Sequence, residues 1–206
     1  MPDQDLKVSN PQRVRALAHP LRLKLMDLLG AEPELTATQC AELTGESVAS
    51  CSFHLRMLAK YGYIQPGERR GREKPWRLVS RSRTVTPDYD DPDSVREVSA
   101  FARLVVEREA DRLRRWLAAA RTQPEEWVGA STITTSSFWL TAAEMQEVSD
   151  ELTALSTRLA ERFSGRRDDA PSRPSGARFV HILGATSVDI AGPTDAADAS
   201  SGEPTP

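Results

Sequence analysis

The chain contains few cysteines and few histidines. Its 206 residues include two cysteines, Cys40 and Cys51, and three histidines. Two cysteines cannot build a disulfide scaffold. The sequence also lacks the Cys/His spacing of a zinc site, a Gly-rich phosphate loop and a Gly-x-Ser-x-Gly nucleophile motif. We therefore expect no catalytic residues and no enzyme activity.

Long apolar runs and a leader segment are also missing. No apolar run reaches the roughly 18 residues that a membrane span requires. The first five residues, MPDQD, are polar and acidic and do not resemble the apolar core of a secretory signal. With so few cysteines, these absences predict a cytoplasmic protein that has no membrane partner.

The formal charge of −3 conceals an uneven distribution. Residues 1–83 hold 14 Lys and Arg against 9 Asp and Glu, whereas residues 84–206 hold 13 against 21. The first part is therefore net basic and the second net acidic. This asymmetry predicts that only the first part meets a polyanion such as DNA.

Capping residues divide the basic part into short elements. Asn10 and Pro11 predict one helix start, Thr36 and Gln39 a capping box, and Ser47 a third N-cap. The expected elements are helices over 10–18, 21–29 (closed by Gly30), 37–43 and 47–60, and strands over 63–65 and 75–79 around the basic turn 67–74. This order predicts a winged helix-turn-helix.

The segments RVRALAHPLRLKLMDLL, TGESVAS, SFHLRMLAKYGYI and RRGREKPWRLV resemble the ArsR-type transcriptional regulators. The resemblance implies a mainly α fold with a small β part, in which the winged helix-turn-helix precedes a long dimerisation helix and a small α/β region. It implies sequence-specific binding to double-stranded DNA, without a catalytic site. Residues 93–190 are similar to the extended C-terminal regions of some such regulators.

In this motif the second helix, 47–60, reads the major groove. We expect Val48, Cys51, Leu55 and Leu58 to face inward. The residues left for DNA are Ser47, Ala49, Ser50, Ser52, Phe53, His54 and Arg56. Three alternatives stay open: Ser47 is only a cap, His54 packs under the wing, or Phe53 packs on another element instead of meeting a thymine methyl group.

The turn between the two strands is rich in basic residues. Arg69, Arg70, Arg72 and Lys74 can clamp phosphates or enter the minor groove. The alternative is a solvated hairpin tip. Because these residues lie within the basic part of the chain, the sequence favours contact with DNA.

The ArsR resemblance also raises the question of metal sensing. The positions that carry the family's paired thiolates fall on Thr36 and Thr38, which cannot supply thiolates. Cys40 and Cys51 occupy apolar positions, and the long C-terminal helix contains no histidine. We therefore expect no metal and no cofactor, and we expect His19 to be a capping or packing residue.

The acidic part begins with a linker, 84–93, and a capping box from Ser94 to Glu97. A helix over 94–121 follows, about 40 Å long at 1.5 Å per residue. Its apolar positions recur three and four residues apart and predict a dimer seam of Val98, Ala102, Val105, Leu113 and Trp116.

Further on, we expect a strand over 131–140, a helix from Thr141 to Phe163 and a strand over 178–183. Trp127, Phe138, Trp139 and Phe163 could line a pocket for a small apolar effector, or form a core or dimer interface. The expected organisation is a flexible N-terminus (1–9), a DNA-binding domain (10–83), a linker (84–93), a dimerisation and effector region (94–190) and a disordered tail (191–206).

The sequence thus favours a homodimeric transcriptional regulator, more readily a repressor than an activator. Its rival is a protein-interaction module on a winged-helix scaffold whose DNA binding is weak or lost. A salt-dependent gel shift on genomic fragments separates the two hypotheses.

Overall fold

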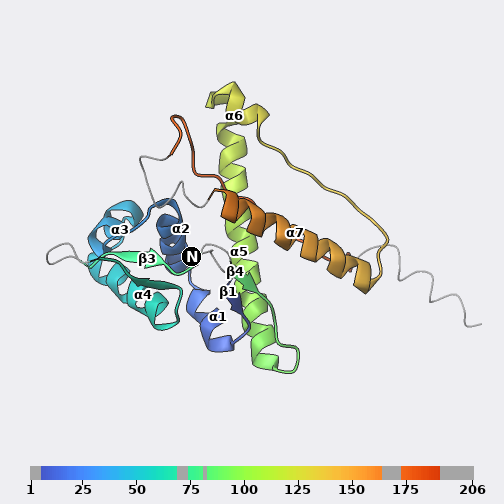
Figure 1. Cartoon of the computed structure of the whole chain (residues 1–206), viewed down its shortest axis with the longest axis horizontal. Helices are drawn as coiled ribbons and strands as arrows, with labels where there is room; N and C mark the ends of the chain where they lie inside the picture. Colours follow the sequence, from blue (N-terminus) through green and yellow to red (C-terminus); the bar gives the residue numbers. More distant parts are fainter. Residues whose placement is uncertain (1–5, 69–73, 81–82, 164–172, 191–206) are drawn as a thin grey trace, which may run out of the picture.

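The computed structural model describes residues 6–68, 74–80, 83–163 and 173–190 (Figure 1). The elements of its first part are β1 (Leu6–Val8), α1 (Pro11–Leu17), α2 (Pro20–Ala31), α3 (Ala37–Thr44), α4 (Val48–Lys60), β2 (Ile64–Pro66), β3 (Trp76–Leu78) and β4 (Arg83–Val85). The second part contains α5 (Pro92–Ala119), a 3-10 turn (Ala120–Thr122), α6 (Glu125–Gly129) and α7 (Ala142–Arg162). In the described residues, no helix combines the length and the apolar character needed to span a membrane.

A two-stranded sheet lies beside α2 and α4. Strands β2 and β3 are antiparallel, with Ile64 opposite Leu78 and Pro66 opposite Trp76. A bridge between Leu35 and Trp76 extends the sheet toward α3. This arrangement confirms the predicted winged helix-turn-helix, followed by one long helix.

The core lies between α1, α2, α4 and the sheet. It is formed by buried apolar side chains such as Leu17, Leu25, Leu55 and Tyr63. The Tyr63 hydroxyl donates to the Arg13 carbonyl oxygen at 2.8 Å, so the one polar atom of this buried ring is satisfied. The sheet and α4 are thereby fixed to α1.

Two short strands lie outside the predicted pattern. Strand β1 pairs in parallel with β4, and the Val8 side chain is buried. The predicted flexible N-terminus therefore contains the whole of β1, and the predicted linker contains part of β4. Three residues are too few to show an alternating pattern, so the sequence carried no signal for this pairing.

Helix α5 begins earlier than the predicted capping box. Asp91 is its N-cap, and its carboxylate accepts from the Asp93 amide. The fully buried Ser94 hydroxyl donates to the Ser9 carbonyl oxygen at 2.6 Å and accepts from the Asp88 amide. The prediction that Ser94 caps the helix was wrong, because its hydroxyl ties the helix to the N-terminal segment.

Gly30 does not close α2, as predicted, but lies within it. The helix continues through Ala31 and is capped at Glu32. A β-carbon at Gly30 would lie 3.5 Å from the Phe179 ring. This is an ordinary van der Waals distance, so the C-terminal segment lies against α2 at this point without requiring a glycine.

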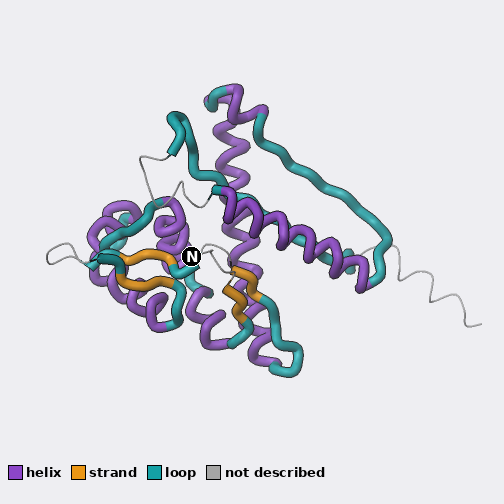
Figure 2. Tube along the Cα trace, in the orientation of Figure 1, coloured by secondary structure: helices purple, strands orange, loops and turns teal. Residues whose placement is uncertain are grey.

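The strands predicted over 131–140 and 178–183 are absent, and these segments are drawn as loops in Figure 2. Their residues are exposed, and no described strand lies beside them to pair with. Strand-favouring residues do not form a strand without a partner for their backbone groups. The predicted helix between them is confirmed, since Thr141 and Glu144 form a capping box at the start of α7.

Candidate nucleic-acid interface

The turn between α3 and α4 is built from capping groups. Thr36 and Gln39 form the predicted capping box of α3, and Gly45 ends this helix with a φ of +76°. A side chain at this φ would be strained, so glycine suits the turn. The Ser47 hydroxyl then accepts from the Ser50 amide at 3.1 Å and starts α4. The Lys24 ammonium donates to the Thr44 carbonyl oxygen at 2.9 Å and holds the turn against α2.

Helix α4 is anchored by one buried face. Cys51, Leu55 and Leu58 are fully buried, as predicted. Val48, however, is exposed, so its predicted inward position was wrong. His54, for which DNA contact and packing were both left open, is buried. Position 54 lies next to Leu55 and Leu58 on the helix surface and faces α2, which supplies polar partners for the imidazole.

A chain of three rings runs from the start of α2 to the outside of α4. The His19 Nδ1 atom accepts from the Leu21 amide at 3.1 Å, which confirms the predicted capping role. The His19 and His54 ring centroids lie 4.4 Å apart, and the Phe53 ring stands edge-on to His54 at 5.1 Å. His54 therefore packs against the start of α2, and not under the wing as the alternative prediction had it.

Both imidazoles are disposed to remain neutral. Burial lowers the pKa of His19, and the nearby Arg22 guanidinium lowers it further. Burial also lowers the pKa of His54, with smaller contributions from His19 and Arg22. The Arg22 Nη1 atom lies 3.4 Å from the His54 Nδ1 atom, so a neutral imidazole can accept a hydrogen bond from the guanidinium.

No other described part of the chain covers the outer face of α4. Ala49, Phe53 and Arg56 are exposed on this face, and Ser50 and Ser52 are half-buried. The Arg56 guanidinium donates to the Ser52 hydroxyl at 2.7 Å. This bond orients the arginine along the helix.

The wing is described at its base. The Gly67 amide donates to the Pro75 carbonyl oxygen at 2.9 Å and closes the hairpin. The Lys74 ammonium lies 4.8 Å from the centre of the Trp76 ring and remains exposed. Three of the predicted DNA contacts, Arg69, Arg70 and Arg72, lie outside the described residues.

The cysteines are buried within the helix-turn-helix. Burial raises the pKa of Cys40 to about 12, and the neighbouring Cys51 contributes. At neutral pH this thiol is protonated, which disfavours metal ligation. In the part of the chain that the structure describes, no three His, Cys, Asp or Glu side chains are grouped to hold a metal ion.

The residues of the predicted dimer seam differ in how far they are buried within the chain. Val98 belongs to the core of its own chain, and Val105 and Trp116 are half-buried, whereas Ala102 and Leu113 are exposed. Val106 and Leu117, which the predicted seam did not include, are also exposed. We name the exposed set of Ala102, Val106, Leu113 and Leu117 the α5 stripe.

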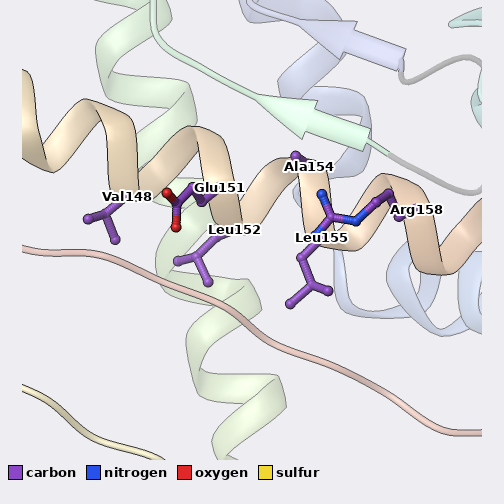
Figure 3. Close-up of a pocket in the computed structure, with 6 residues that line it drawn as sticks. All are labelled: Val148, Glu151, Leu152, Ala154, Leu155 and Arg158. Carbon is purple, nitrogen blue, oxygen red and sulfur yellow. The ribbon is translucent and has the colours of Figure 1, made fainter.

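The four aromatic residues predicted to line a pocket do not converge. Trp127 lies under the Arg178 guanidinium at 5.0 Å, while Phe138 and Trp139 are highly exposed. Phe163 follows the end of α7. A shallow hollow on α7 is lined instead by Val148, Glu151, Leu152, Ala154, Leu155 and Arg158 (Figure 3).

The helix pair α3–α4 and the β2–β3 hairpin define a winged helix-turn-helix. A helix-turn-helix domain model matches residues 17–62. Among solved structures, the chain is similar to a homodimeric winged helix-turn-helix DNA-binding domain from Mycobacterium bovis, described as a possible ArsR-family transcriptional regulator. The identity is 27%, the match covers 46% of this chain and 76% of that chain, and the TM-score is 0.31.

A second solved structure is described as a possible transcriptional regulator for arsenical resistance. It shares 27% identity over 50% of this chain and 94% of that chain, with a TM-score of 0.31. No curated protein matches the chain. The helix-turn-helix match covers residues 17–62, and the two solved structures match about half of the chain.

Proposed function

We propose that this chain is a DNA-binding transcriptional regulator that acts as a dimer. The observation that carries the proposal is the position of α4, which buries Cys51, Leu55 and Leu58 and leaves Ala49, Phe53 and Arg56 exposed. A helix held in this way after a tight turn can enter a major groove. The adjacent wing then reaches the flanking backbone or minor groove.

The proposed contacts follow the two elements. Bases and nearby phosphates are contacted by Ser47, Ala49, Ser50, Ser52, Phe53 and Arg56, and the wing contributes Arg69, Arg70, Arg72 and Lys74. His54 is buried, so we do not include it among the proposed contacts. We assign it instead the role of positioning the Phe53 ring. Residues 10–83 then form the DNA-binding unit, and residues 94–190 serve dimerisation and regulation.

We assign dimerisation to the α5 stripe. Its members lie four and seven residues apart, which is the spacing of a helix that packs along a partner helix. A dimer presents two copies of α4, which favours inverted half-sites about 10 bp apart or a multiple of this distance. Repression follows most directly, because a dimer on a promoter excludes polymerase by occupancy alone.

Fluorescence anisotropy with labelled duplexes over a range of salt concentrations tests the DNA-binding proposal. Arg72→Ala is expected to weaken binding to all sequences and to reduce the salt slope by about one unit, since each phosphate contact contributes about 0.9. Ser50→Ala is expected to keep the slope and to relax the preference at one position in each half-site, by at most about 1–3 kcal/mol. If Arg72→Ala changed the base preference and Ser50→Ala changed the salt slope, the roles assigned to the wing and to α4 would be reversed.

Exposed aromatic residues beyond the winged helix favour a second candidate, the protein-interaction module. Phe138 and Trp139 are among the most exposed apolar side chains of the described residues. Such side chains are common at protein interfaces. If neither Arg72→Ala nor Ser50→Ala changes DNA binding, this second candidate becomes the better account.

A further inference from the structure

The outer face of α4 carries an unusual side chain for a surface that meets DNA. Phe53 is 52% exposed in the middle of this face. Ala49, one turn earlier on the same face, is also exposed and is too small to cover the ring. Arg56, almost one turn later, provides a positive charge. The face therefore places an apolar ring between a small residue and a cation.

The Phe53 ring is held in place by His54, on the side that faces the protein. It packs edge-on against His54, with an angle of 80° between the rings and centroids 5.1 Å apart. His54 is itself buried and stacks on His19, which caps α2. A ring fixed in this way loses little conformational entropy when it contacts a partner.

The edges of base pairs in the major groove are mainly hydrogen-bond donors and acceptors. The exception is the C5 methyl group of thymine, which accepts apolar contact. A benzyl side chain against a polar edge would leave that edge without a partner, which is unfavourable. An apolar ring on the groove-facing helix therefore selects a thymine methyl group over the other groups in reach.

We propose that Phe53 contacts a thymine methyl group in each half-site, and that His54 and His19 position its ring. The inference rests on the proposed function, because it requires α4 to lie in a major groove. Arg56, oriented by its bond to the Ser52 hydroxyl, contacts the backbone beside the same base. Phe53 is thus assigned as a specificity-determining residue.

The test replaces thymine with deoxyuridine, which keeps the base pair and the charge and removes only the methyl group. The probe is a duplex selected by the full-length chain from a random-sequence library. Each thymine is replaced in turn, and the dissociation constant is measured by anisotropy. We expect one position in each half-site to weaken binding about fourfold, the change that corresponds to one buried methyl-sized group.

Three variants locate the contact. Phe53→Ala is expected to bind thymine and uracil duplexes equally, because the ring that senses the methyl group is gone. Arg56→Ala is expected to weaken both duplexes by the same factor and to retain the fourfold difference. Tyr89→Ala removes an exposed aromatic ring from the loop before α5 and is expected to change neither.

The outcomes separate the inference from the proposed function. Sequence-specific binding that is indifferent to uracil at every position would overturn the inference and leave the function standing. The same holds if Phe53→Ala retains the full uracil effect, which would indicate that the ring serves another contact. Failure of the wild-type chain to select any duplex would overturn both.

Discussion

The α5 stripe leads to a quantitative prediction about assembly. Val106, Leu113 and Leu117 are 55%, 41% and 53% exposed. Complete burial of a Val or Leu side chain stabilises by about 1.5–3 kcal/mol. About half of each side chain remains to be covered, so the burial of each one at an interface contributes about 1 kcal/mol.

Placing a carboxylate in the stripe should therefore weaken the dimer strongly. Leu113→Asp removes about 2 kcal/mol of apolar burial from the two copies and desolvates two unpaired carboxylates, at about 1 kcal/mol or more each. The expected loss is about 4 kcal/mol, which raises the dimer dissociation constant about a thousandfold.

Sedimentation equilibrium over a wide range of chain concentrations measures this change. Ala100→Asp is the matched control, because residue 100 is exposed on the side of α5 away from the stripe. We expect the control to associate as the wild type does. A wild-type chain that is monomeric at micromolar concentration, or a Leu113→Asp chain that associates normally, would refute the assignment of the interface.

Three further predictions concern stability and metal. Ser94→Ala leaves the Ser9 carbonyl and the Asp88 amide without their partner, so the free energy of unfolding in urea should fall by about 1–3 kcal/mol. The control Ser99→Ala, on the exposed side of α5, should lower it by less. The pKa values of His19 and His54 are lowered in the folded chain, so the unfolded chain takes up protons first as the pH falls through about 6.5. Stability should therefore be complete above that pH and decline below it, and His54→Gln should make the decline shallower in pH-dependent thermal melts. Zinc, cadmium and arsenite should leave DNA affinity unchanged; release of DNA at stoichiometric metal that Cys40→Ser abolishes would contradict the metal-free prediction.

The elements that carry explicit capping residues could be predicted from the sequence. Asn10, Thr36, Ser47 and Thr141 each cap the helix that they were expected to start. Capping is a local interaction between a side chain and the next turn, so its residues are close in the sequence. Ser94 shows the limit of such patterns, because its partner Ser9 is 85 residues away.

The faces of α4 were predicted less well than its ends. The spacing of Val48, Cys51, Leu55 and Leu58 fits a helical stripe, but Val48 lies in the first turn, beyond the edge of the core. His54 is buried because α2 supplies His19 and Arg22 at the correct distance. The burial of a polar ring depends on such distant partners, which a periodic pattern does not contain.

A polar residue, Glu109, interrupts the apolar positions of α5. Its contacts belong to a cluster of ion pairs that connects α5 to α2. Glu109 accepts a hydrogen bond from Arg112, whose guanidinium also reaches Asp27 on α2 at 2.5 Å. Arg108 binds the same Asp27 carboxylate. The first turns of α5 thus pack on α1 through Val98, whereas its later turns are fixed to α2 by charge.

These ion pairs are partly exposed, so their effect on stability is modest and their effect on geometry is the larger one. Asp27 holds two arginines one turn apart, which fixes the direction in which α5 leaves the winged helix. In a dimer built on the α5 stripe, this direction sets the distance between the two copies of α4. On the proposed function, we expect the spacing of the half-sites to depend on Asp27, a carboxylate that need not contact DNA. Asp27→Asn should then change the preferred half-site spacing and leave the base preference unchanged.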